Sequence, residues 1–171
     1  MKLYYGILFI TSVFLTGIYS LIWRKRFSAF LTLNYALIPI VNLGYYIVAV
    51  SQNVPEAIVG IKISYLGIFA HIFIMYTIFD LCNLNIKKAF RLILLAVSTF
   101  FFFSALTIGS TTFFYKNITG ELIENTLVLH KKYGLIHTLY YVQVFIYMGI
   151  TISATFYTIC KKKDVSRHNL R

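Results

Sequence analysis

Five long apolar runs, separated by short polar junctions, constrain this 171-residue chain more than any other feature of its sequence. An α-helix needs about 20 mainly apolar residues to cross the hydrocarbon core of a bilayer. Lipid offers no partners to backbone N–H and C=O groups, so a spanning segment of this kind must satisfy them internally, as a helix does. The sequence therefore predicts an all-α integral membrane protein, an antiparallel bundle of five transmembrane helices. The runs cover residues 3–23, 27–50, 57–81, 90–108 and 135–160.

The composition agrees with a membrane location. Hydrophobic residues make up 59% of the chain and charged residues only 12%, and the mean hydropathy of +0.77 is well above that of soluble domains. A net charge of +11 would suit nucleic acid, but the basic residues gather at helix junctions instead. We therefore expect the lipid bilayer as a partner and no nucleic acid.

The basic residues also predict a topology. Eleven of the 16 Lys and Arg residues lie in three alternate junctions, which follow the first, third and fifth runs. Junctions rich in Lys and Arg stay in the cytoplasm under the positive-inside rule. We therefore predict a multi-pass protein of the cell membrane with its N-terminus outside and its C-terminus inside.

The second outer loop, residues 109–133, is much longer than the other junctions. Two stretches rich in Thr, Phe, Tyr, Ile and Val flank a turn-forming Asn and Gly cluster, a pattern that predicts a β-hairpin. Two interpretations of this hairpin remain open. It is either a connector on the membrane surface or a lid over a site that the outer half of the bundle forms.

Several polar residues fall inside the apolar runs, where they face the bundle interior or water. Asp80 lies near a cytoplasmic helix end, and an ion pair with Lys87 is the simplest expectation for it. Asn34 and Asn42 are eight residues apart, so they share a helix face and suit hydrogen bonding between helices. A histidine satisfied by a neighbouring helix is the default expectation for His71 and His137. Gln143 completes this set of polar residues.

The sequence lacks the common enzyme signatures. It contains no His-Glu-x-x-His pair, no Gly-rich phosphate loop and no Gly-x-Ser-x-Gly elbow. Its five acidic residues are dispersed over separate loops and helix ends, which makes acid/base chemistry inside the membrane hard to assemble. We therefore expect neither an enzyme nor a cofactor, a metal site or catalytic residues.

Two stretches resemble a known family. Leu43-Gly44-Tyr45-Tyr46 is followed by Glu56-Ala57 and by Lys-Ile-Ser-Tyr-Leu-Gly-Ile at residues 62–68. Tyr133-Gly134 then opens the fifth run with an aromatic stretch behind it. This pattern is similar to the N-terminal seven-transmembrane sensor region that precedes bacterial histidine kinases and diguanylate cyclases. The resemblance covers essentially the whole chain, which corresponds to the first five helices of that region.

The resemblance implies a function and a cellular location. It implies a single sensory input domain over residues 1–171 in a bacterial cytoplasmic membrane, detecting an extracellular or intramembrane signal. The two further helices and the C-terminal output domain of the family are missing, so a truncated region is expected, and a homodimer is one assembly open to it. The alternative is a small transporter or membrane-assembly protein for which five helices are complete.

A ligand site is expected in the outer half of the bundle, where tyrosines gather with a few charged residues. The same residues also suit an aromatic belt at the membrane interface, with charges reaching toward water. Small residues at Gly44, Gly67, Gly134 and Gly149 are positions at which helices could approach closely. The candidate ligand-binding residues are Tyr45, Tyr46, Glu56, Lys62, Tyr65, His137, Tyr140 and Tyr141.

Overall fold

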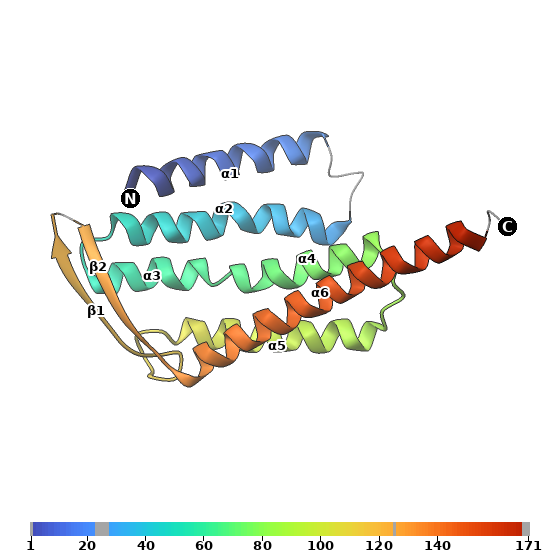
Figure 1. Ribbon diagram of the computed structural model, residues 1–171. Helices are drawn as coiled ribbons and strands as arrows, with labels where there is room; N and C mark the ends of the chain where they lie inside the picture. Colours follow the sequence, from blue (N-terminus) through green and yellow to red (C-terminus); the bar gives the residue numbers. More distant parts are fainter. Residues whose placement is uncertain (1, 23–27, 125, 169–171) are drawn as a thin grey trace.

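The computed structural model describes residues 2–22, 28–124 and 126–168, with side chains up to residue 161. The helices lie along an elongated bundle, and a two-stranded hairpin lies across one end of it (Figure 1). The first helix begins at the hairpin end, whereas the last helix finishes at the opposite end (Figure 1). The helices are α1 (Lys2–Ile22), α2 (Ala29–Val50), α3 (Val54–Ser64), α4 (Gly67–Leu81), α5 (Lys88–Leu106) and α6 (Leu135–His168), and the strands are β1 (Tyr115–Ile123) and β2 (Thr126–Tyr133).

The predicted fold class is confirmed at the level of its helices. Within the described residues, five helical segments are long and apolar enough to cross a membrane, with α3 and α4 together forming the third. Their outward faces carry many exposed Leu, Ile, Val and Phe side chains, as expected of surfaces that lie in lipid. The predicted topology in a membrane stays a prediction.

The third helix is interrupted, whereas the sequence predicts a single helix there. Its first part ends at Ser64 and its second begins at Gly67, with Tyr65 and Leu66 between them. The N–H of Leu66 donates to the carbonyl of Ile63 (3.1 Å), and the N–H of Ile68 donates to that of Tyr65 (3.0 Å). These bonds reach back three residues instead of four, which tightens the turn between the two helices.

The α2 and α3 helices touch backbone to backbone. A Cβ atom placed on Gly44 would lie 2.5 Å from the amide nitrogen of Ser64, and one placed on Gly60 would lie 2.7 Å from the carbonyl oxygen of Gly44. Any larger side chain at either position would push the helices apart. Gly44 is therefore a position of close helix approach, as predicted. Gly149 is not, because a Cβ atom placed on it would have no other atom within 4 Å.

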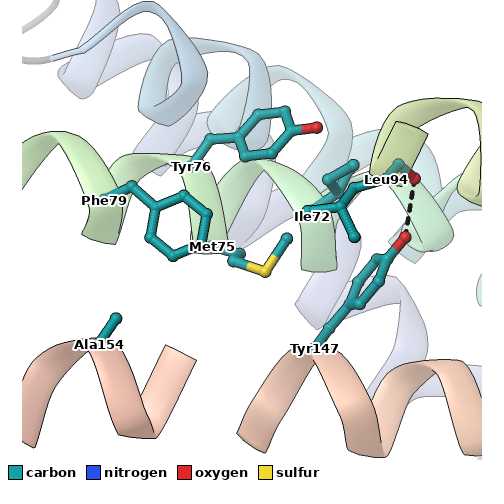
Figure 2. Close-up of a cluster of buried hydrophobic side chains, with 7 residues drawn as sticks. All are labelled: Ile72, Met75, Tyr76, Phe79, Leu94, Tyr147 and Ala154. Carbon is teal, nitrogen blue, oxygen red and sulfur yellow. Dashed lines mark hydrogen bonds between the residues drawn. The ribbon is translucent and has the colours of Figure 1, made fainter. Parts of the chain in front are cut away.

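The larger buried cluster lies in the half of the bundle away from the hairpin. It joins Met75 and Phe79 of α4 to Leu94 of α5 and Tyr147 of α6 (Figure 2). The Tyr147 hydroxyl donates to the backbone carbonyl of Leu94 at 2.7 Å, the contact marked by the dashed line (Figure 2). This cluster fixes α6 against α4 and α5.

Asp80 forms the ion pair expected of it, but with a different partner. Its carboxylate lies 2.9 Å from the guanidinium of Arg91, whereas Lys87 stands at the start of α5. The Arg91 guanidinium also lies 5.7 Å from the ring centroids of Phe30 and Tyr76. The pair therefore ties α4 to α5 at the end of the bundle away from the hairpin.

Candidate ligand-binding site

The predicted hairpin is present and packs against the bundle, but its turn was predicted at the wrong place. The Asn and Gly cluster at residues 117–120 lies inside β1, which continues to Ile123. Strands β1 and β2 are antiparallel, with Tyr115 opposite Tyr133 and Ile123 opposite Thr126. A Cβ atom on Gly120 would lie 2.9 Å from the Val54 side chain, so β1 crosses the start of α3 without room for a side chain there. The hairpin therefore covers the end of α3.

Buried residues at the base of the hairpin anchor it. Phe114 is fully buried, and Tyr115 is 6% exposed. Both belong to a cluster with Ile61 of α3 and Ile108 just after α5. Gly134 lies so close to the Phe113 carbonyl that a Cβ atom would clash with it. Because both ends of the hairpin are packed, its position over the bundle is set by the core.

A cavity of about 610 Å³ lies beneath the hairpin. Helix α2 contributes apolar residues such as Ile38 and Val41, and α4 contributes Gly67 and Ala70. The hairpin and α6 contribute tyrosines, a lysine and a histidine. Its volume falls within the range of about 300 to 1,000 Å³ that is typical of small-molecule sites.

The cavity brings together most of the residues predicted from the sequence as a ligand site. They come from α2, from the break between α3 and α4, and from α6, which are far apart in the chain. The five that line it are Tyr45, Tyr65, His137, Tyr140 and Tyr141.

The other three predicted residues are not part of its lining. Glu56 caps α3, because its carboxylate accepts from the Gln52 N–H (3.1 Å) and the Asn53 side-chain amide (2.8 Å). Lys62 lies in the last turn of α3, where a positive charge complements the helix dipole. Tyr46 faces α1, since its ring lies 3.4 Å from a Cβ placed on Gly6. These three residues have roles within the bundle.

His137 is the most deeply buried titratable side chain of the cavity wall. It is 2% exposed, stacks on the Tyr133 ring with centroids 4.3 Å apart, and meets Phe114 edge to face. Its ring makes no hydrogen bond with any other described residue, so the expected satisfaction by a neighbouring helix is not seen. His71, also in the lining, bonds to the Gly67 carbonyl of its own helix at 2.9 Å. A polar ring at the cavity wall is therefore left without a protein partner.

Lys131 is a site residue that the sequence analysis missed. It lies on β2, is partly buried and lines the cavity. Burial lowers the pKa of its ammonium group. Within the described part of the chain the only ion pair is Arg91–Asp80, so no carboxylate neutralises Lys131. The alternation of strand side chains could have found it, because Lys131 shares a face with Leu129, which packs on the core.

A hydrogen bond links the hairpin to the helix break. The hydroxyls of Tyr65 and Tyr115 lie 2.6 Å apart. Burial raises the pKa of the Tyr115 phenol to about 12. The Tyr65 ring also meets Phe114 and Tyr140 edge to face, at centroid distances of 4.8 and 5.8 Å. The break in the third helix, the hairpin and α6 therefore share one contact cluster at the cavity.

The asparagines of α2 do not bond between helices as predicted. Asn42 lines the cavity, and Asn34 is 7% exposed with no partner for its carbonyl oxygen among the described residues. In α6, Gln143 donates to the Ser98 hydroxyl of α5 at 2.9 Å. Other hydrogen bonds join α1 to α2, where the Thr16 hydroxyl donates to the Tyr35 carbonyl at 2.8 Å, and α4 to α5, through Asp80 and Arg91.

No family model, no curated protein and no solved structure matches this chain. The site is therefore interpreted from its own geometry, and the resemblance to the seven-transmembrane sensor region stays a prediction.

Proposed function

We propose that this chain is the membrane-embedded sensory input domain of a bacterial signal-transduction receptor of the histidine-kinase or diguanylate-cyclase type. One observation carries the proposal. Helix α6 forms part of the cavity wall through His137, Tyr140 and Tyr141, and it continues unbroken to the other end of the bundle. Its 34 residues span about 51 Å at 1.5 Å per residue. A ligand in the cavity would thus touch the same rigid element that reaches the opposite side.

The predicted topology determines which end of α6 faces the outside of the cell and which end faces the cytoplasm. The hairpin and the start of α1 lie at one end of the bundle, and α6 finishes at the other (Figure 1). With the N-terminus outside, the cavity lies toward the outer face and α6 leads into the cytoplasm. The chain itself acts as a non-catalytic input region, and any kinase or cyclase chemistry belongs to an output domain.

The mechanism requires two packings of the same bundle. A ligand shifts their populations only if it binds one of them more tightly. The contacts that a ligand in the cavity would change are the Tyr65–Tyr115 hydrogen bond and the stacked Tyr133–His137 pair, because these residues line the cavity. A change there would displace α6 relative to α4, against which it packs.

Spin-label distances test this proposal without knowledge of the ligand. Labels are placed at Leu21→Cys in α1 and Phe156→Cys in α6, both exposed positions away from the hairpin. The native cysteines, Cys82 and Cys160, are replaced by serine. The cavity is then filled with a bulky ring through Ala70→Trp, and the distance distribution is measured by double electron–electron resonance in lipid nanodiscs.

We expect the filled cavity to shift the distance distribution between the two labels. The matched control is Val142→Trp, which adds the same ring to an exposed face of α6 outside the cavity lining and should leave the distribution unchanged. Identical distributions for Ala70→Trp, Val142→Trp and the parent protein would overturn the proposal, because a sensor must transmit cavity occupancy to the far end.

A further inference from the structure

The cavity beneath the hairpin has a one-sided charge. Among the described residues of its lining, Lys131 is the only Lys or Arg, and none is Asp or Glu. Glu121 and Glu124 lie on the exposed far part of the hairpin, and Asp80 is paired with Arg91. A lining with a basic residue and no acidic one favours an anion over a cation.

A second polar group of the wall can bind the same anion. The His137 ring lines the same cavity as Lys131. It is buried to 98% and bonds to no other described residue, although buried polar groups normally have a partner. An acidic oxygen would accept hydrogen bonds from both the Lys131 ammonium and the His137 ring, and bonds to ionised groups are among the stronger ones in proteins.

The rest of the wall suits an apolar body. Tyr65, Tyr115 and Tyr140 present aromatic rings to the cavity, while Ile38 and Val41 supply aliphatic surface. Aromatic rings pack favourably against other rings in stacked or edge-on arrangements. A cavity of about 610 Å³ accepts a molecule of drug size.

A cage of tyrosines can also hold a quaternary ammonium through cation–π contacts. Here the ammonium of Lys131 would repel such a ligand, and no carboxylate of the lining would offset that repulsion. The charge of the wall therefore decides between the two ligand classes.

We propose that the cavity binds a small organic acid, a molecule with one acidic group on an aromatic or branched hydrocarbon body. The acidic group lies between Lys131 and His137, and the body lies among the tyrosine rings. This assignment rests on the proposed function, since it names the ligand class of the same cavity.

Three probes that share a naphthyl body and differ in charge test the assignment. They are 2-naphthoate, the neutral 2-naphthamide and the cationic 2-naphthyltrimethylammonium, each titrated calorimetrically into the protein in phosphatidylcholine nanodiscs. We expect 2-naphthoate to bind at least tenfold more tightly than the amide. Lys131→Gln should remove that preference. Lys132→Gln should retain it, because Lys132 is exposed and outside the cavity lining.

Several results would overturn the assignment. Tightest binding by the cationic probe, equal affinity for acid and amide, absence of binding by every probe, or the same loss in both lysine variants would each contradict it. The spin-label distances do not depend on any probe, so these results would leave the proposed function standing. Unchanged distances together with acid-selective binding would overturn the function and retain the ligand class.

The acid could come from the outer aqueous phase or from the bilayer, and lipid composition separates the two sources. The ratio of 2-naphthoate affinities between the parent protein and Lys131→Gln is compared in nanodiscs with and without phosphatidylglycerol. A ratio that falls toward one with phosphatidylglycerol indicates that an anionic lipid occupies the cavity. An unchanged ratio indicates that a free acid occupies it. Both results require that Lys131 binds the acidic group of the ligand.

Discussion

The hydroxyl groups of Tyr65 and Tyr115 lie 2.6 Å apart, and this contact joins the break in the third membrane helix to the first residue of the hairpin. Both side chains line the cavity. A change in the cavity therefore reaches the helix break and the hairpin through one hydrogen bond, which makes this pair the first place to test the account.

Removal of either hydroxyl should weaken the attachment of the hairpin. A hydrogen bond of this kind contributes about 1 kcal/mol, so a double-mutant cycle of Tyr65→Phe and Tyr115→Phe should give a coupling energy of that order. The measurement is the free energy of unfolding in detergent. Tyr133→Phe, at an exposed side chain, serves as the control and should change little. Strictly additive effects of the two substitutions would show that the contact does not stabilise the fold.

Alkaline pH should weaken the same attachment. The pKa of the Tyr115 phenol is raised from 10.0 to about 12 by burial. Below pH 10 the phenol is neutral in the folded and unfolded chain, and its contribution to stability is fully present. Between pH 10 and 12 the unfolded chain loses the proton first, so that contribution is lost. Melting temperatures of the parent and Tyr115→Phe should therefore converge between pH 10 and 12, and a constant gap would contradict the assigned burial.

The close approach of α2 and α3 should tolerate no side chain. Gly60→Ala places a Cβ atom 2.7 Å from the Gly44 carbonyl oxygen, and overpacking of this kind costs about 1–3 kcal/mol. Gly149→Ala, on an open face of α6, should leave stability equal or slightly higher, because Ala favours a helix by roughly 1 kcal/mol over Gly. Equal unfolding free energies for the two variants would show that the helices do not touch at Gly60.

The buried hydrogen bond between Gln143 of α6 and Ser98 of α5 should affect stability differently in single and double variants. Ser98→Ala removes the partner of Gln143 and leaves its buried amide unpaired, at a cost of about 1–3 kcal/mol. Ser98→Ala combined with Gln143→Leu removes the unpaired group and should recover most of that loss. Thermal unfolding in detergent measures both variants. A double variant less stable than Ser98→Ala alone would contradict this explanation.

The five membrane-spanning segments could be predicted from the sequence because lipid imposes one requirement on every such segment. The existence of the hairpin was predictable as well, since its β-prone stretches are local signals. Its turn was not, because the Asn and Gly cluster at residues 117–120 pairs inside β1. The interruption at Tyr65 and Leu66 was not, because the apolar run continues through it and the hydrogen bonds that tighten the turn depend on neighbouring packing.

The candidate site was predictable in part for a similar reason. Tyrosines near the outer helix ends could be grouped by depth in the membrane, and five of the eight predicted residues line the cavity. Glu56 lies outside that lining, because its carboxylate caps the start of α3. Lys131 was missed because its place on the wall depends on how the hairpin folds back over the bundle, a contact between distant parts of the chain.

The most direct test of the account asks whether the hairpin controls access to the cavity. A single cysteine at Ala70→Cys, with Cys82 and Cys160 replaced by serine, is allowed to react with a sulfonate-bearing methanethiosulfonate that does not cross lipid. We predict that Tyr115→Phe, which removes the hydrogen bond between the hairpin and the helix break, speeds this reaction severalfold and leaves the reaction of a cysteine at the exposed Val142 unchanged. Equal rates at Ala70→Cys with and without the Tyr115 hydroxyl would contradict the claim that the hairpin closes a ligand site.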